Sequence, residues 1–446
     1  MAKAKTAYVC SDCGAHSVKW AGQCPECGVW NTLSEVRISA SGDSAGGELQ
    51  PASLGQVAGA SVDRIGCGFG EFDRVLGGGL LPGAVILLGG DPGVGKSTLL
   101  QQVSASLADS VSVVYATGEE SLRQVGERAN RLNLATTAMQ LLADTSIDNI
   151  IAQAAKATAQ VLIVDSIQTM SSDAVPSAPG SVAQLRDCVG RLVQFAKQND
   201  VAVFLIGHVT KDGTIAGPRV VEHMVDTVLY IERDASSRYT LIRSVKNRFG
   251  ATGEMGVFAM QDIGFREVNN PSAIFLPDES TGEPGSTIAI PWEGSRALLV
   301  EVQALVADSA STHTRRLATG MDSSRLAMLL AVLQRHADLA LGAYDVFVNV
   351  VGGLRITETA IDLPAALAIA SSYRNRRVVE GAVSFGEIGL AGEVRPVPYG
   401  EERIEAAIRQ GLSRVICPEA NVPRRKVHGI EVTGVRRLRD AIEAIT

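Results

Sequence analysis

One segment, GDPGVGKST at residues 90–98, constrains the fold of this 446-residue chain more than any other. The apolar run AVILLG precedes it, and apolar residues follow at helical spacing, at Leu99, Leu100, Val103 and Leu107. A strand, a glycine-rich loop and a helix in this order form a P-loop, whose backbone N–H groups surround the phosphates of a nucleotide. The sequence therefore predicts a nucleotide-binding α/β fold.

We expect this loop to bind a nucleotide together with Mg²⁺. Lys96 is expected to reach the β- and γ-phosphates, and the Ser97 hydroxyl is expected to ligate Mg²⁺. Asp165 ends the apolar run VLIVDS and is expected to hold the Mg²⁺ shell from a neighbouring strand. With Asp165, the predicted nucleotide-binding residues are Gly90, Asp91, Pro92, Gly93, Val94, Gly95, Lys96, Ser97 and Thr98.

Polar residues also end two further apolar runs. Glu119 and Glu120 follow VSVVYATG, where a carboxylate can orient and deprotonate the attacking water. We favour Glu119 as this base and keep Glu120 as the second choice. Either could instead be a helix N-terminal charge, because SLRQVGERANRL follows. His208 ends VAVFLIGH and is either a sensor of the γ-phosphate or a capping or core histidine.

Apolar runs alternate with helical stretches over residues 84–208. The runs AVILLGG, VSVVYATG, VLIVDS and VAVFLIGH are continuously apolar, which indicates strands buried on both faces and hence a parallel sheet covered by helices. TVLYIERD and YTLIRSVKN follow closely and are predicted to form an antiparallel edge.

Four cysteines near the N-terminus form two CxxC pairs, Cys10 with Cys13 and Cys24 with Cys27. Two such pairs can present four thiolates tetrahedrally to one Zn²⁺, and a site closed by four ligands is structural. Disulfides or unligated thiols are the alternative, but this spacing in a cytosolic chain favours zinc. The other cysteines are expected to be buried apolar thiols: Cys67, Cys188 and Cys417.

Composition divides the chain into four predicted parts. These are a zinc-binding module at residues 1–34, a flexible Ser-, Gly- and Ala-rich linker at 35–62, a nucleotide-binding domain at 63–275 and a further α/β domain at 285–446. The last boundary follows from the Pro-, Asn- and Gly-rich stretch NNPSAIFLPDESTGEPG.

The net charge of −7 argues against a surface coated with cations, although a local basic stripe is sufficient for DNA binding. No run approaches the ~18 apolar residues that a membrane helix needs. The start MAKAKTAYVC lacks the apolar core of an export signal. We therefore expect a cytoplasmic protein without a membrane partner.

These motifs together resemble a known family. GDPGVGKST, GEES, VLIVDS and RVLGGGLLPG are similar to the RecA/DnaB/KaiC group of ATPases, and KNRFG at residues 246–250 is the hallmark of the RadA (Sms) family. A Cys-rich N-terminus, KNRFG and a Lon-protease-like C-terminal domain occur together in that family, so the resemblance covers nearly the whole chain. Cys67 stands where the family usually has Thr, and no step of the ATP chemistry depends on it.

The resemblance implies a RecA-like P-loop core, an N-terminal four-Cys zinc finger and a C-terminal Lon-protease-like domain. It also implies a hexameric ring with ATP at subunit interfaces and DNA-dependent ATPase activity. The ring would translocate on DNA in branch migration of recombination intermediates with the RecA recombinase. In such rings a cation reaches the neighbouring subunit's nucleotide, and Lys246 and Arg248 are the candidates here. They could instead be solvated charges at a strand end.

Two Gly-, Ser- and Pro-rich segments are candidates for DNA contact. One is SSDAVPSAPGSVAQLRD with Arg186, and the other is TKDGTIAGPRVVEH with Lys211 and Arg219. Neither has an aromatic residue for base stacking. We therefore expect contact with single-stranded and branched DNA without sequence specificity, with affinity from six copies acting together.

The C-terminal region resembles the Lon proteolytic domain but lacks its dyad. ETAIDLPAALAIA aligns with the segment around the family's nucleophilic Ser, where this chain has Ala365, and VRPVPYGEERIEAA aligns with the segment around the catalytic Lys, where it has Glu401. Proteolysis is therefore not expected. The domain is expected to build the ring and to offer a second DNA surface. Five arginines could form that surface or simply be solvated: Arg315, Arg316, Arg374, Arg376 and Arg377.

Two other functions remain as alternatives. An ATP-dependent Lon-like protease is disfavoured by Ala365 and Glu401. A KaiC-like signalling ATPase would bind protein partners and no DNA, and stimulation of ATP turnover by DNA distinguishes it from a repair ATPase.

Overall fold

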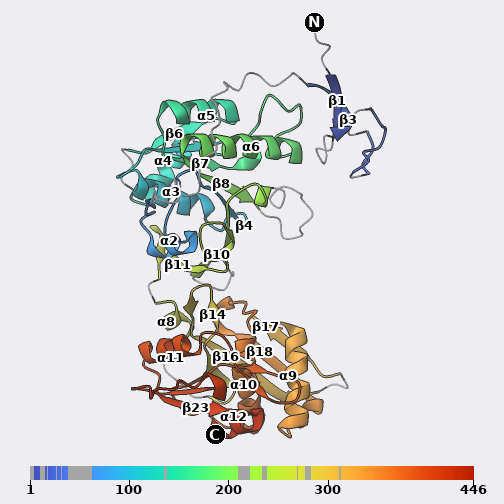
Figure 1. Ribbon diagram of the computed structural model, residues 1–446, viewed down its shortest axis with the longest axis vertical. Coiled ribbons are helices and arrows are strands. Elements are labelled where there is room, and N and C mark those ends of the chain that lie inside the picture. The colour runs from blue at the N-terminus through green and yellow to red at the C-terminus, as the bar shows by residue number, and fades with distance from the viewer. Residues whose placement is uncertain are drawn as a thin grey trace. The chain divides into compact units, whose positions relative to one another are not determined.

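The computed structural model divides the chain into two compact units (Figure 1), Met1–Arg233 with Arg238–Glu267, and Asp234–Ser237 with Val268–Thr446. We call them the N-terminal and C-terminal units and describe each by itself. Residues 39–62, most of the predicted linker, lie outside the described residues. The predicted linker starts too early, because residues 35–38 belong to the strand Leu33–Ile38, which pairs with the strand Lys5–Cys10 of the Cys-rich module. The structure describes residues 5–10, 16–17, 19–26, 28–31, 33–38, 63–134, 138–208, 221–233, 239–268, 270–276, 283–310 and 313–445.

The main sheet of the N-terminal unit has nine strands in the order β12-β11-β10-β9-β4-β8-β7-β5-β6. Their bounds are β4 Val85–Gly90, β5 Val113–Thr117, β6 Gln140–Ala143, β7 Val161–Asp165, β8 Ala202–His208, β9 Thr227–Glu232, β10 Tyr239–Asn247, β11 Met255–Gln261 and β12 Gly264–Glu267. The strands from β9 to β6 run parallel, and β10, β11 and β12 continue antiparallel. The predicted parallel sheet is confirmed. The antiparallel edge, however, begins only at β10, because β9 pairs in parallel with β4.

Helices cover both faces of this sheet. Their bounds are α2 Gly70–Leu76, α3 Lys96–Leu107, α4 Leu122–Arg131, α5 Ile147–Lys156 and α6 Val182–Asn199. Successive side chains of a strand point to opposite faces, so β4 contributes Ile86 and Leu88 to one apolar core and Val85 and Leu87 to the other. The first core also contains residues of α2 and α3, and the second contains residues of α5 and α6. This double burial explains why the strands are continuously apolar.

Serine residues begin three of these helices. The hydroxyls of Ser121, Ser146 and Ser181 each accept a hydrogen bond from the backbone N–H three residues on, at the start of α4, α5 and α6. The helix after the P-loop differs, because its N-cap is Gly95 and no side chain caps it. Its first-turn N–H groups therefore remain available to an anion.

A small three-stranded sheet lies near the N-terminus, in the order β2-β1-β3. Its strands are β1 Lys5–Cys10, β2 His16–Ser17 and β3 Leu33–Ile38. Cys10, Cys24 and Leu33 form its buried cluster. A cluster this small supplies little hydrophobic stabilisation, which is why modules of this size usually depend on a metal or disulfides.

The C-terminal unit is a second α/β domain built on a seven-stranded sheet in the order β17-β18-β16-β13-β19-β22-β23. The strands are β13 Ser286–Ala289, β16 Val300–Asp308, β17 Arg316–Thr319, β18 Tyr344–Val350, β19 Ala382–Ser384, β22 Arg414–Pro418 and β23 Glu431–Val435. Two hairpins join them, β14 Trp292–Glu293 with β15 Arg296–Ala297, and β20 Glu387–Ile388 with β21 Val394–Arg395. The helices are α8 Ser272–Phe275, α9 Ser323–His336, α10 Asp362–Arg374, α11 Gly400–Arg409 and α12 Leu438–Ala444.

One fully buried arginine, Arg403 on α11, organises the C-terminal unit locally. Its guanidinium donates to the carbonyl oxygens of Ile290 and Pro398 and forms an ion pair with Glu358. The ring of Trp292 lies 6.0 Å from it. A buried charge persists only when its hydrogen bonds are satisfied, and these partners supply them.

Arg403→Ala is expected to destabilise the protein by about 3–5 kcal/mol, because it empties a fully buried position and removes the donor from the carbonyl oxygens of Ile290 and Pro398 and the cation from Glu358. Arg409→Ala on the same helix is the control, since Arg409 is exposed and its pair with Glu405 spans 3.8 Å; it should cost no more than about 0.5 kcal/mol. Urea unfolding followed by tryptophan fluorescence measures both, and equal losses would contradict the assignment.

Candidate nucleotide site

Glycines shape the P-loop at the end of β4. Gly95 has φ +107°, and a Cβ there would lie 2.8 Å from the ring of Phe265. A Cβ on Gly90 would lie 2.5 Å from the carbonyl oxygen of Ile231. Because neither position accepts a side chain, the loop can curve tightly enough for its N–H groups to face a phosphate.

Lys96 is 3% exposed and its ammonium is held over the loop. Its Nζ donates to the carbonyl oxygens of Gly90 at 2.8 Å and Asp91 at 2.9 Å. Burial lowers the pKa of Lys96, and the charges of Asp165, Glu119 and Asp91 oppose this shift. The ammonium is therefore positioned to exchange carbonyl contacts for stronger contacts to phosphate oxygens.

Asp165 ends β7, as the sequence predicted, and is 3% exposed. The strand is not the neighbour of the P-loop strand that the sequence suggested, because β8 lies between β7 and β4. Its carboxylate accepts hydrogen bonds from the Tyr115 hydroxyl at 2.6 Å and from the Ser97 hydroxyl. Burial raises the pKa of Asp165, and the two hydroxyl donors oppose this shift. Ser97 and Asp165 thus meet as a pair of hard oxygen ligands, a donor set that suits Mg²⁺.

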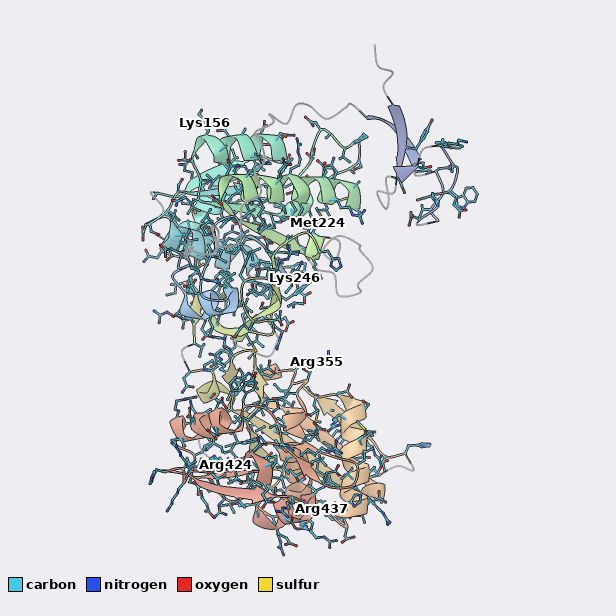
Figure 2. The ribbon with its side chains drawn as sticks, viewed as in Figure 1. Lys156, Met224, Lys246, Arg355, Arg424 and Arg437 are labelled. Atoms are coloured by element: carbon cyan, nitrogen blue, oxygen red, sulfur yellow. The ribbon has the colours of Figure 1, made fainter. Side chains whose placement is uncertain are left out.

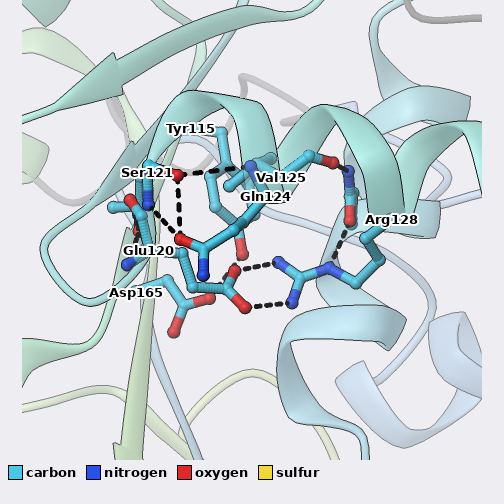
Figure 3. A network of polar contacts seen from close by, with 9 residues as sticks. Tyr115, Glu120, Ser121, Gln124, Val125, Arg128 and Asp165 are labelled. Atoms are coloured by element: carbon cyan, nitrogen blue, oxygen red, sulfur yellow. Dashed lines mark hydrogen bonds and ion pairs between the residues drawn. The ribbon is translucent and has the colours of Figure 1, made fainter.

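Glu119 and Glu120 are adjacent in the chain but lie in different surroundings. Figure 3 shows Glu120 paired with Arg128, at 2.7 Å, and Arg128 also donates to Gln101. Glu119 accepts a hydrogen bond from the Ser166 hydroxyl and, at 3.3 Å, contacts Nε2 of His208. Glu120 is thus neutralised by an arginine of the helix that follows it, α4, whereas Glu119 contacts groups at the ends of β7 and β8. This arrangement favours Glu119 as the carboxylate that meets water.

The two predicted DNA-contacting segments are only partly described. Residues 209–220, which include Lys211 and Arg219, lie outside the described residues. Arg186 was predicted on the other segment as part of a loop, but the structure has it exposed on α6, because Ser181 begins that helix. The loop itself is therefore shorter than the sequence suggested.

Lys246 and Arg248 lie at and just beyond the end of β10, beside the segment that contains Met224 (Figure 2). Lys246 Nζ donates to the carbonyl oxygens of Glu222 and Val225, each at 2.8 Å. Arg248 forms an ion pair with Asp226 at 3.2 Å. Both cations therefore have partners within their own chain.

The Cys-rich module brings two of the four predicted zinc ligands into one cluster. Cys10 is fully buried and Cys24 is 2% exposed. Cys13 and Cys27 lie outside the described residues. After Cys24 the backbone turns back, with Gly28 N–H donating to the Cys24 carbonyl at 3.0 Å and Gly28 at φ +72°. A tight turn that encloses a CxxC pair suits tetrahedral zinc ligation.

The other residues singled out in the sequence lie as follows. Ala365 is fully buried in α10, and Glu401 is exposed at the start of α11. Cys67, Cys188 and Cys417 are fully buried, as predicted. Burial raises the pKa of Cys188 and of Cys417 to about 12, so both thiols stay protonated at neutral pH. The five arginines proposed for a second DNA surface are exposed: Arg315, Arg316, Arg374, Arg376 and Arg377.

Sequence reasoning missed three groups at this site, namely Tyr115, Ser166 and Arg128. Tyr115 lies within a predicted strand, and its hydroxyl reaches Asp165 only because β5 and β7 are neighbours. Ser166 follows Asp165 directly and could have been suspected from its position alone. No helix among the described residues has the length and apolar character needed to cross a membrane.

A parallel sheet with a P-loop at the end of β4, an Asp at the end of β7, two strands away, and a carboxylate near that Asp defines a RecA-like P-loop ATPase. Family models match three parts of the chain: an AAA domain at residues 56–214, a rubredoxin metal binding domain at 8–35 and the subunit ChlI of Mg-chelatase at 326–421. The predicted fold class, with its zinc-ribbon module and Lon-like C-terminal domain, is confirmed.

Curated proteins of high similarity share their whole length with this chain. DNA repair protein RadA of Pseudomonas aeruginosa is 51% identical over all of both chains. The RadA proteins of Escherichia coli and Bacillus subtilis are 49% and 43% identical over 99% of each chain. The chain belongs to the RadA family of DNA repair proteins.

Solved structures also resemble part of the chain. A KaiC-like protein of Pyrococcus horikoshii is 18% identical with a TM-score of 0.40 and covers 47% of this chain and all of its own. The RadB recombinase is 21% identical with a TM-score of 0.38 and covers 46% of this chain and all of its own.

The two glutamates give a matched test of the catalytic base. Glu119→Gln is expected to lower ATP turnover at least about 100-fold with little loss of nucleotide affinity, because an amide cannot accept the proton of water. Glu120→Gln should retain most turnover but lower the Tm, since it breaks the pair with Arg128. Steady-state hydrolysis and fluorescent-nucleotide binding measure the two effects, and the reverse ranking would reassign the base.

Asp165→Asn separates the stability cost of burying the Asp165 carboxylate from the role of that carboxylate in Mg²⁺-dependent turnover. Because the pKa of Asp165 is raised, its charged form destabilises the fold above that pKa, and the cost disappears as the pH falls and the carboxyl protonates. The variant should therefore have a higher Tm without nucleotide at pH 8, with a gain that shrinks as the pH falls toward the pKa of Asp165, while Mg²⁺-dependent turnover is lost. Calorimetry over a pH series from 8 downward checks this, and a lower Tm at pH 8 would refute it.

Proposed function

We propose that this chain is a DNA-stimulated ATPase that acts in recombinational DNA repair as a hexameric ring, promoting branch migration of recombination intermediates in concert with a RecA recombinase. Membership in the RadA family supports a role in repair. The contact between Glu119 and His208 supports DNA stimulation, because His208 lies two residues before the start of the segment predicted to contact DNA. DNA bound by that segment would therefore act close in the chain to the carboxylate that we assign to hydrolysis.

In this proposal, residues 90–98 and Asp165 bind Mg²⁺-ATP. Lys96 neutralises charge on the β- and γ-phosphates. Ser97 and Asp165 would hold Mg²⁺, and the bound ion would supply charge neutralisation at the transferring phosphoryl group. Glu119 orients and deprotonates the attacking water. Its contacts to Ser166 and His208 hold the carboxylate in place until the water is positioned.

Lys246 and Arg248 act in this scheme on the nucleotide of the neighbouring subunit. Within one chain Lys246 binds backbone carbonyls and Arg248 binds Asp226. When these two side chains move to a neighbour's nucleotide, they exchange their intrachain contacts for contacts to its phosphates. Hydrolysis therefore depends on assembly of the subunits. A cation supplied in trans is worth ~10³–10⁵ in rate.

We assign DNA contact to backbone phosphates, without sequence specificity. The candidate segments are rich in Gly, Ser and Pro and carry few cations, so affinity arises from six copies acting together. Single-stranded and branched DNA are the expected substrates. The exposed arginines of the C-terminal unit are a second candidate surface.

The other parts of the chain have supporting roles in this proposal. Residues 1–38, which include β3, bind one structural Zn²⁺ through Cys10, Cys13, Cys24 and Cys27, residues 39–62 act as a linker and residues 63–267 hydrolyse ATP. Residues 285–446 build the ring and do not cleave peptides, since Ala365 has no nucleophile and lies buried.

Mixed oligomers test assembly-dependent hydrolysis directly. Lys96→Ala and Arg248→Ala variants should each be inactive, but a mixture should recover a substantial part of DNA-stimulated turnover, because some interfaces pair an intact Lys96 with a neighbour's intact Arg248. ATP turnover on size-selected oligomers, with and without single-stranded DNA, measures this.

The control is a mixture of wild type with the double variant. This mixture forms no new interface that combines an intact Lys96 with an intact Arg248, so its ATP turnover should not exceed that of wild type at the same dilution. If mixing the two single variants restores nothing while wild type responds to DNA, Arg248 acts within its own chain. If wild-type turnover is indifferent to DNA, the KaiC-like alternative replaces the proposed function.

A further inference from the structure

Two tryptophan side chains lie exposed and close together on the Cys-rich module. Trp20 is 59% exposed and Trp30 is 66% exposed. A Cβ on Gly22 would lie 3.5 Å from the Trp30 ring and 3.9 Å from the Trp20 ring, so the glycine lies between them without a side chain of its own. Tryptophan is highly buried on average, so an exposed adjacent pair points to a surface that receives a ligand.

Backbone hydrogen bonds hold this pair in place. The N–H of Asn31 donates to the carbonyl oxygen of Gly22 at 2.7 Å, and Gln23 forms a β-bridge with Trp30. The Gln23 side chain donates to the carbonyl oxygen of Gly28 at 2.8 Å. The rings are therefore carried on a fixed turn, and little conformational entropy is lost when a flat ligand stacks on them.

The chemistry around the pair favours nucleic acid over an apolar protein segment. Lys19, the residue before Trp20, is exposed. Residues 1–34 contain three lysines against Asp12 and Glu26, and four thiolates on one Zn²⁺ would add two negative charges, so the cation offered to a phosphate is Lys19 itself and not a net positive charge of the module. Aromatic rings beside a cation are the usual means by which proteins stack unpaired bases and contact their phosphates.

No other described part of the chain offers an equivalent aromatic surface. Tyr399 is the one further exposed aromatic side chain among the described residues, and it stacks on Trp292 with centroids 4.2 Å apart. The candidate DNA segments of the N-terminal unit contain no aromatic residue.

We propose that Trp20 and Trp30 form a stacking platform for the bases of single-stranded DNA, with Lys19 contacting a phosphate. This inference rests on the proposed function and names a surface for it. Phosphate contacts elsewhere would supply salt-dependent affinity, and the platform would add a preference for unpaired bases.

Zinc-loaded full-length protein titrated with oligo(dT) tests the proposal. Stacking should quench tryptophan fluorescence, and the quenching should persist in Trp292→Phe, whose two remaining tryptophans are the proposed platform. The double variant Trp20→Ala/Trp30→Ala should bind oligo(dT) about tenfold more weakly or worse, whereas Trp20→Phe/Trp30→Phe should retain most affinity because phenylalanine also stacks.

An abasic oligonucleotide of equal length is the matched probe, because it keeps the phosphates and lacks the bases. It should bind without quenching and should not distinguish wild type from the double alanine variant. Equal quenching by both probes would overturn the platform, and so would unchanged oligo(dT) affinity in a double alanine variant with full zinc content. Quenching of the tryptophan fluorescence by a protein partner, and not by DNA, would overturn it as well.

ATP turnover measured on the same samples separates this inference from the proposed function. If single-stranded DNA stimulates wild-type turnover but does not quench tryptophan fluorescence, the platform fails and the DNA-stimulated ATPase stands. If DNA neither binds nor stimulates, both fail.

Discussion

The parallel hydrogen-bond register of four adjoining strands determines where the chemistry of this protein can occur. Gly90 lies opposite His208 in the β4–β8 pairing, and Thr117 lies opposite Asp165 in the β5–β7 pairing. Because parallel strands end at the same edge, four segments that are far apart in the sequence deliver the P-loop, Asp165, Glu119 and His208 to one place. The apolar cores on both faces of the sheet maintain that register, so the hydrophobic layers and the site depend on the same strands.

The nucleotide site contains charged groups whose burial is unfavourable in the protein without ligand. Burial lowers the pKa of Lys96 and raises that of Asp165, so each group is pushed toward its neutral form. Phosphate oxygens and Mg²⁺ are the partners that reverse both shifts, since one is anionic and the other cationic. A site of this kind sacrifices some stability in the unliganded protein and regains it on binding, which is usual where pKa values are perturbed by burial and a specific partner.

Patterns of short range could be predicted from the sequence, and contacts of long range could not. The P-loop, the strand-end positions of Asp165 and Glu119 and the parallel sheet follow from apolar runs and local motifs. The choice between Glu119 and Glu120 does not, because it depends on Arg128 eight residues later and on Ser166 and His208 from other strands. Arg403 gives the same lesson, since nothing in the run GEERIEAA distinguishes the one charge that the structure buries completely.

The two cations of KNRFG are not equally easy to release toward a neighbour. Arg248 has a 58% exposed side chain, and Asp226 keeps Lys197 at 2.6 Å and the Val85 N–H at 3.1 Å when Arg248 leaves. Lys246 is half-buried and satisfies the carbonyl oxygens of Glu222 and Val225, which would lose their donor. Because two partly buried carbonyl oxygens without a donor cost more than one broken exposed ion pair, Arg248 can reach a neighbour's nucleotide at lower cost than Lys246 can.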